Sequence, residues 1–153
     1  MLACDLRLHT ETVWPHTRES IVAGPATGLL QGGDLVTFEA THFLIRQRLT
    51  ARVTEYVAPY RFVDEMISGA FRTLRHTHAF EVCGERTMMT DTLELSAPLG
   101  ILGWLAERVV LRSYMEAFLI YRNRKLKAEA ERRAKQQMNT LLFDNRPKQV
   151  RKE

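Results

Sequence analysis

Two histidines spaced two residues apart are the strongest candidates for chemistry in this sequence. His76 and His78 lie in RTLRHTHAFEV, where the alternation of residue types predicts a β-strand with both imidazoles on one face. The next strand-like segment supplies Asp91, and a two-residue turn at Gly84-Glu85 would place His78 opposite Asp91 and Phe80 opposite Met89. An imidazole beside a carboxylate can hold or transfer a proton, so general acid–base catalysis is one chemistry open to this cluster.

A carboxylate from the preceding strand is expected beside this cluster. Asp64 and Glu65 are consecutive, so one of them must share the face of the histidines. If residues 68–71 form the loop, Glu65 lies opposite Leu74 and faces inward. A loop that differs by one residue brings Asp64 inward instead, because a register slip exchanges the two faces. The sequence leaves both registers open, and our candidate for the ligand-facing carboxylate is Glu65.

Four interpretations of His76, His78 and Asp91 fit the sequence. The simplest is a hydrogen-bonded polar network that fixes the strand register, because buried polar groups need partners. The same side chains could instead orient a ligand at the end of an apolar pocket, or act as an acid and a base. Two histidines and one carboxylate are also the ligand set of some metal sites.

Six strands and one long helix are expected to position these residues. Alternating residue types and flanking turn residues predict strands at residues 19–24, 34–43, 45–57, 60–68, 72–82 and 86–96. Residues 101–137 contain no proline and only Gly103, and their apolar residues recur at helical spacing, with Leu105 and Val109 on the apolar face. A short helix is expected within residues 1–13, where Asp5 could cap it. An antiparallel meander followed by a helix is an α+β arrangement.

The composition indicates one globular domain. The chain has 153 residues, 45% of them hydrophobic and 26% charged, which suits a single core. We assign residues 1–137 to this domain and residues 138–153 to a basic, flexible tail. No apolar run reaches the ~18 residues of a membrane-spanning helix, and the N-terminus does not resemble a signal peptide. Cys4 and Cys83 fit no metal or redox motif, so we expect a cytoplasmic protein.

The net charge of +4 is concentrated near the C-terminus, in residues 122–135 and in the final RPKQVRKE. Glu129 and Glu131 interrupt the basic run, and it contains no aromatic residue on which a base could stack. We therefore interpret it as a solvated helix end and expect no nucleic-acid partner. A weak contact with an anionic membrane surface is compatible with the same charges.

Several segments spread over roughly residues 5–127 resemble the bacterial SRPBCC family, in the cyclase/dehydrase-like branch of the START and Bet v 1-like superfamily. They are RFVDEMISGAFRTLRHTHAFE, TMMTDTLELSAPLGILGWLAE and YRNRKLK, preceded in order by LRLHTETV, GLLQGGDLVTFEATHF and RQRLTARVTEY. The resemblance implies the helix-grip fold, a curved antiparallel sheet around a long C-terminal helix, with a deep ligand cavity and neither metal nor other cofactor. Family members begin with a further strand that is absent here, so we expect an unpaired sheet edge.

From this resemblance we expect the cavity to bind a small hydrophobic molecule, such as a lipid, a quinone or a polyketide-like compound. One alternative is a polyketide cyclase or dehydratase with His76 or His78 as base and Asp91 orienting it. Another is an interaction protein that uses the open sheet edge and the basic tail. The sequence leaves open whether the chain is an enzyme and which oligomer it forms. The ligand-binding candidates are Phe38, His42, Glu65, His76, His78, Phe80, Met89, Asp91, Leu105 and Val109.

Overall fold

The computed structural model describes residues 1–98, 100, 104–105 and 107–144. Six strands form one antiparallel sheet in the order β1-β2-β3-β4-β5-β6. Helices precede and follow the sheet, so the arrangement is α+β, as the sequence predicts. The bounds of the strands are β1 Ser20–Ala23, β2 Leu35–His42, β3 Ile45–Val57, β4 Arg61–Ser68, β5 Thr73–Cys83 and β6 Arg86–Ser96. Within the described residues β1 and β6 each pair on one side only, so the sheet has open edges.

The β5–β6 hairpin has the predicted register. Cys83 pairs with Arg86 across a two-residue turn in which Gly84 has a φ of 62°. Glycine adopts this left-handed conformation without the steric penalty of a Cβ atom, so its position fixes the turn. His78 consequently lies opposite Asp91.

The β4–β5 register answers the question that the sequence left open. Asp64 pairs with His76 and Glu65 pairs with Arg75, so Asp64 shares the face of the histidines. The register that places Glu65 inward, opposite Leu74, is wrong. Glu65 lies on the outer face, where its carboxylate forms an ion pair with Arg75. Leu74 still faces inward, because it lies on the opposite pleat from Arg75.

Among the described residues, helical structure follows the sheet at Gly100, at Trp104 and Leu105, and from Glu107 onward. A π-helix, η3 (Glu107–Leu111), leads directly into the long helix α3 (Arg112–Asp144). The helix continues to Asp144, beyond residue 137 where the sequence predicted its end. Residues 138–144 contain neither proline nor glycine, so no residue in this stretch interrupts the helix. Residues 145–153 of the predicted tail lie outside the described residues.

Only part of the apolar face predicted for the helix turns to the sheet. Leu105 is 53% exposed and Val109 is 65% exposed, so neither packs against the sheet. The inward face carries Leu111, Met115 and Phe118, which also belong to the predicted apolar face, together with Leu119 and Arg122. A π-turn holds an additional residue compared with an α-turn, so η3 rotates the apolar positions before it away from those after it.

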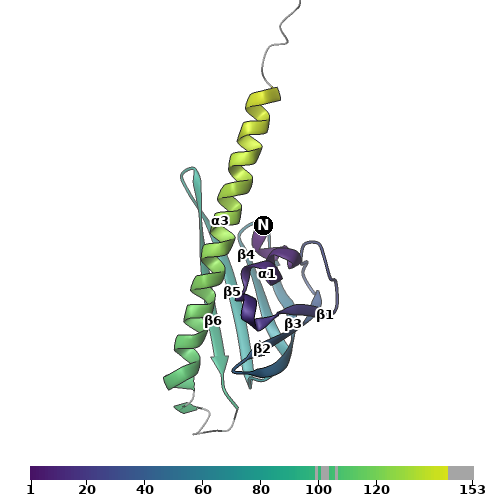
Figure 1. Cartoon of the computed structure of the whole chain (residues 1–153), viewed down its shortest axis with the longest axis vertical. Coiled ribbons are helices and arrows are strands. Elements are labelled where there is room, and N and C mark those ends of the chain that lie inside the picture. The colour runs from purple at the N-terminus through teal and green to yellow at the C-terminus, as the bar shows by residue number, and fades with distance from the viewer. Residues whose placement is uncertain (99, 101–103, 106, 145–153) are drawn as a thin grey trace, which may run out of the picture.

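The N-terminal helix α1 (Leu6–Thr12) lies on the same face of the sheet as α3, and the two helices touch (Figure 1). The carboxylate of Asp5 accepts hydrogen bonds from the backbone N–H groups of Arg7 and Leu8, which confirms the predicted cap. Short 3-10 turns, η1 (Leu2–Cys4) and η2 (Pro15–Thr17), flank α1. The core between α1, α3 and the sheet contains Cys4, Leu6, Leu8, Leu30, Val36, Phe38, Val53, Phe62 and Leu126.

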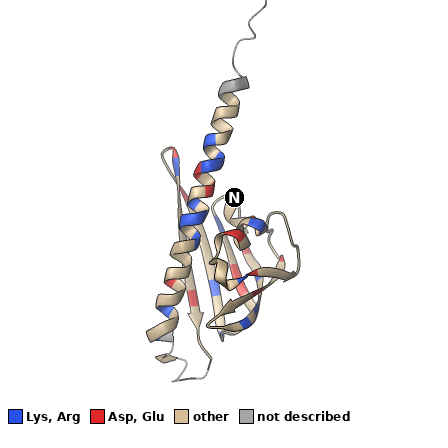
Figure 2. Ribbon diagram, viewed as in Figure 1, with Lys and Arg blue, Asp and Glu red and all other residues tan. Residues whose placement is uncertain are grey.

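The C-terminal half of α3 extends past the sheet and carries charges of both signs (Figure 2). Arg132 and Arg133 both donate hydrogen bonds to Glu129, and these bonds lower the pKa of Glu129 to about 2. This pairing on the helix surface agrees with a solvated helix end. None of the described helices is both long enough and apolar enough to cross a membrane.

Candidate functional site

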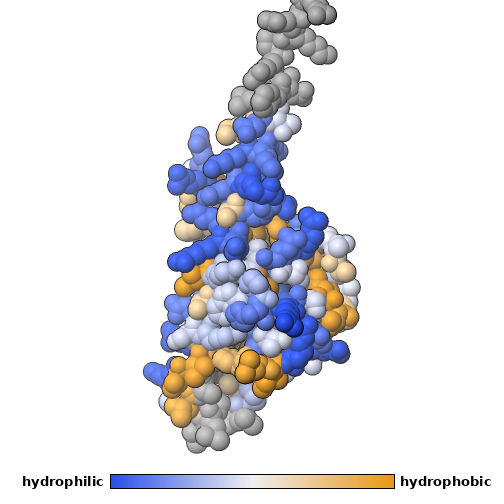
Figure 3. Space-filling view, viewed as in Figure 1, coloured by the Kyte–Doolittle hydropathy of each residue, from blue (hydrophilic) through white to orange (hydrophobic). Residues whose placement is uncertain are grey.

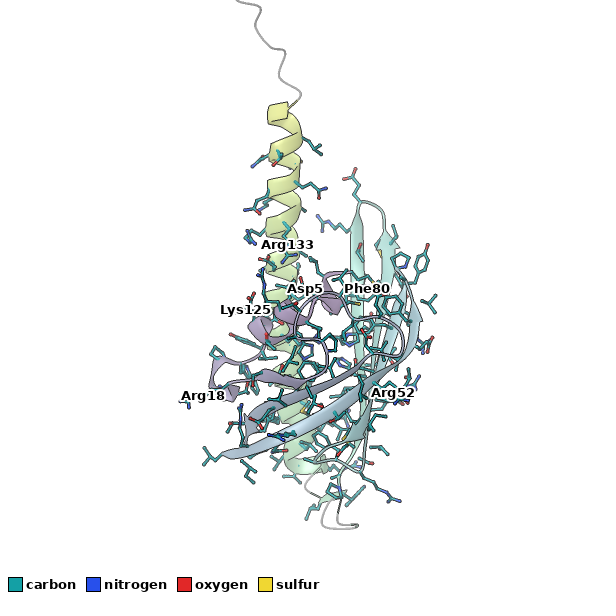
Figure 4. The ribbon with its side chains drawn as sticks, turned by 90° about the vertical axis from the view of Figure 1, so that its right-hand side faces the viewer. Asp5, Arg18, Arg52, Phe80, Lys125 and Arg133 are labelled. Atoms are coloured by element: carbon teal, nitrogen blue, oxygen red, sulfur yellow. The ribbon has the colours of Figure 1, made fainter. Side chains whose placement is uncertain are left out.

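A cavity of about 300 Å³ lies between the sheet and α3. Its walls are mostly apolar, with Phe38, Ala40, Leu49, Ala51, Leu74 and Leu93 from the sheet facing Leu111, Met115, Phe118 and Leu119 from the helices. In Figure 4, Arg52 points away from α3 on the outer face of the sheet, because neighbouring residues of a strand alternate between faces. Phe43, Phe71 and Pro98 also line the cavity. Figure 3 shows apolar side chains gathered at the lower end of the molecule.

Ionisable side chains from β4, β5 and β6 meet behind one wall of this cavity. His78 lies between two carboxylates, with Nε2 3.1 Å from Oδ1 of Asp64 and Nδ1 2.6 Å from Oδ1 of Asp91. His76 Nε2 lies 3.6 Å from the same Asp91 oxygen. The ring of Phe62 stacks on His78 with the ring centroids 4.0 Å apart, so His78 is almost completely shielded from solvent.

Burial and the two carboxylates act in opposite directions on the pKa of His78. Burial alone would lower it, but the hydrogen bond to Asp64 and the contact with Asp91 outweigh burial and raise the pKa. For Asp64 and Asp91 burial would raise the pKa, but the neighbouring histidines lower it. These shifts favour the protonated form of His78 and the ionised forms of both carboxylates.

His76 has the opposite behaviour. Burial lowers its pKa, and the positive charge of His78 lowers it further against a weaker opposing effect of Asp91. His76 therefore stays neutral, and unlike His78 it lines the main cavity. A neutral imidazole that faces a ligand cavity can accept a proton or a hydrogen bond.

A second polar chain joins α1, the segment before β1 and α3. Arg122 of α3, only 3% exposed, has a guanidinium nitrogen 3.1 Å from Nδ1 of His9. A guanidinium only donates, so His9 Nδ1 accepts this hydrogen bond and Nε2 carries the proton. That Nε2 lies 3.3 Å from Oε1 of Glu19. The ring of His9 also stacks on Phe38, with centroids 4.5 Å apart.

A third polar pair lies farther along the cavity. His42 Nδ1 is 2.8 Å from the hydroxyl oxygen of Tyr114, and both residues line the cavity. Burial lowers the pKa of His42. Trp14 packs against Tyr114 and Phe118 packs against His42, each in an edge-to-face arrangement, so the neighbours of this polar pair are aromatic.

The structure brings together some of the predicted ligand-binding residues but not all of them. Phe38, His42 and His76 line the cavity, and so does Asp64. His78 lines a smaller adjoining hollow, while Asp91 supports both histidines from behind. The remaining candidates lie elsewhere: Phe80 and Met89 pack against the core, Glu65 is on the outer face, and Leu105 and Val109 are exposed.

Several cavity residues were not anticipated from the sequence, among them four that form the polar contacts described above. His9 and Glu19 come from an N-terminal stretch with no local motif, and Tyr114 is one of many aromatic residues. Arg122 begins the basic run that we interpreted as solvated. Its position one helical turn after Phe118, a residue of the buried face, is the one sequence signal that could have separated it from its exposed neighbours.

The same cluster has the ligand types of a divalent metal site. One ligand atom each from Asp64, His76 and His78 lies within 4.8 Å of the other two. Asp91 would then orient His78 through its second ring nitrogen, as carboxylates commonly do for metal-binding histidines. The third ligand in this arrangement is Asp64, whereas the sequence suggested Asp91. The absence of a metal stays a prediction.

Comparison with known proteins supports the fold alone. No protein-family model matches the sequence, and no characterised protein matches it significantly. Among solved structures, the chain is similar to the crystal structure of TTHA0849 from Thermus thermophilus. The TM-score is 0.58 at 20% sequence identity, over 84% of this chain and 86% of the other. The two proteins therefore share the arrangement of sheet and C-terminal helix over most of their length.

Proposed function

We propose that this chain binds a small hydrophobic molecule in the cavity between the sheet and α3. The observation that carries this proposal is the cavity itself, a space of about 300 Å³ with apolar walls and a few polar groups at defined positions. Ligand sites in proteins commonly have this composition and a volume from about 300 Å³ upward. The helix-grip fold is part of the proposal, supported by the long C-terminal helix facing one side of an antiparallel sheet.

A cyclase or dehydratase acting in the same cavity is the second candidate function. One observation favours it: His76 is neutral, lines the cavity, and lies 3.6 Å from Asp91, which would orient it as a base. His78 is the weaker candidate, because an imidazolium between two carboxylates has no free nitrogen with which to accept a proton. His76→Gln separates the two functions, since a binding protein keeps its ligand affinity whereas an enzyme loses turnover.

A cavity-filling substitution tests the binding function. Ala40 is buried and lines the cavity, so Ala40→Phe places an aromatic ring in the ligand space. We expect the wild-type chain to bind the neutral apolar fluorophore phenylnaphthylamine and Ala40→Phe to lose at least ~tenfold in affinity, which corresponds to about 1.4 kcal/mol. Fluorescence titration measures both.

The matched control is Ala26→Phe, because Ala26 is exposed in the loop between β1 and β2. It adds the same ring at the surface and should bind the fluorophore as the wild-type chain does. Equal affinities of all three proteins would show that the fluorophore binds outside the cavity, and the proposed function would lose its support. Circular dichroism of Ala40→Phe establishes that the variant is folded.

A further inference from the structure

Arg122 is a buried cation without a carboxylate partner in the described part of the chain. Among the described residues, no aspartate or glutamate oxygen lies within 4.0 Å of its guanidinium nitrogens. Its single hydrogen bond within these residues goes to Nδ1 of His9, which accepts it. Its Nε atom is buried and has no hydrogen-bond partner within the described part of the chain. A buried guanidinium is costly unless an anion balances it, so this arrangement is electrostatically incomplete.

The carboxylates around the cavity contact histidines and not Arg122, although Oε1 of Glu19 is buried without a hydrogen-bond partner among the described residues. Asp64 and Asp91 both face His78, and Glu19 reaches Arg122 only through the imidazole of His9. Arg122 itself lines the cavity from the side of α3. The Nε–H group without a partner therefore belongs to a side chain at the wall of an apolar cavity. The polar group of a ligand would lie against this wall.

We propose that the ligand is an apolar monocarboxylic acid, whose carboxylate accepts hydrogen bonds from Arg122 while its apolar body fills the cavity. This inference rests on the proposed binding function and specifies the ligand class. A guanidinium presents its N–H groups in a fixed fork that matches a carboxylate.

The surrounding charges favour a monoanion of modest size. A phosphate group would bring close to two negative charges toward a single arginine, with the ionised Asp64 also at the cavity wall. A volume of about 300 Å³ is at the lower end of the range for ligand sites, which suits a medium-chain or aromatic acid better than a two-chain lipid.

Decanoate and decanol provide a matched pair of probes, because they share an apolar chain and differ in the charged group. At neutral pH we expect decanoate to displace phenylnaphthylamine from the wild-type chain with a Kd at least ~tenfold lower than that of decanol. Arg122→Met should remove this preference and leave the affinity for decanol within ~twofold. The matched control is Arg124→Met, since Arg124 is exposed on the same helix and should not change either affinity.

The outcomes separate this inference from the proposed function. If decanol binds as tightly as decanoate to the wild-type chain, the carboxylate claim is overturned while the binding function stands. If neither compound displaces the fluorophore, both are overturned. Should Arg122→Met fail to fold, the wild-type comparison of the two compounds still decides, and Arg122→Lys, which keeps the charge but loses the fork, provides the second variant.

Discussion

At the residue scale, the histidine pair shows how position alone separates two chemically identical side chains. His76 and His78 are two residues apart on one face of β5, and their ring centroids are 3.9 Å apart. His78 contacts two carboxylates and is held protonated, whereas His76 faces the cavity beside that positive charge and is held neutral. Assigning the proton to His78 leaves His76 as the imidazole that a ligand meets.

This division predicts opposite pKa shifts for the two histidines. The pKa of His78 should lie above the ordinary histidine value of about 6.5, and that of His76 below it. Imidazole nitrogen NMR spectra recorded across a pH titration measure both values. Two histidines that titrate together near 6.5 would contradict the assignment.

The same shifts set the direction of the pH effects on stability. The stabilisation from His78 is fully present below pH 6.5 and is lost as the pH rises through its folded pKa. For His76 the sign is reversed, so stability falls as the pH drops from 6.5 through its lower folded pKa. The lowered pKa values of Asp64 and Asp91 add stability that is lost only in stronger acid, below their ordinary range.

At the element scale, the β2–β3 turn combines backbone strain with an exposed apolar side chain. His42 pairs with Ile45, which leaves Phe43 and Leu44 as a two-residue turn with φ values of 51° and 65°. A left-handed conformation is unfavourable for residues with a Cβ atom, and glycine or asparagine normally occupies such turns. Phe43 packs its ring on Tyr114, but Leu44 is 98% exposed and gains no packing in return.

Leu44→Gly should therefore stabilise the fold by about 1 kcal/mol. The substitution removes a penalty of roughly 1–2 kcal/mol for the left-handed backbone conformation, and the entropic cost of ordering glycine offsets part of this gain. Urea denaturation gives the free energy of unfolding. Leu44→Ala is the control: it removes the same exposed side chain but keeps the Cβ atom, so it should bring no comparable gain. An equal gain from both substitutions would show that the backbone conformation is not the cause.

The elements also show which features local sequence determines. The β5–β6 register follows from one glycine in a two-residue turn, so it could be predicted residue by residue. The full inward face of α3 could not be predicted in the same way. Residues 101–121 carry apolar side chains on several sides in the sequence, and the π-helix at Glu107–Leu111 changes the rotation of the helix about its axis. For β4, the loop length before β5 decided which of Asp64 and Glu65 faces inward, and the sequence does not specify it.

At the scale of the whole molecule, the polar groups of the cavity come from opposite ends of the chain. His9 and Arg122 are 113 positions apart and meet because α1 and α3 lie on the same face of the sheet. No spacing rule links such residues, so the sequence indicated the cavity and its histidines but not the cation opposite them.

Native mass spectrometry is the most direct test of a ligand cavity, using the chain purified from cells and the same chain incubated with decanoate or decanol. We predict a non-covalent adduct on the wild-type chain and on Ala26→Phe, and we expect denaturation to release it. The adduct should be strongly reduced on Ala40→Phe, in which the phenyl ring fills the cavity. A wild-type chain without adduct in all three preparations, indistinguishable from Ala40→Phe, would contradict the claim that the cavity binds a hydrophobic molecule.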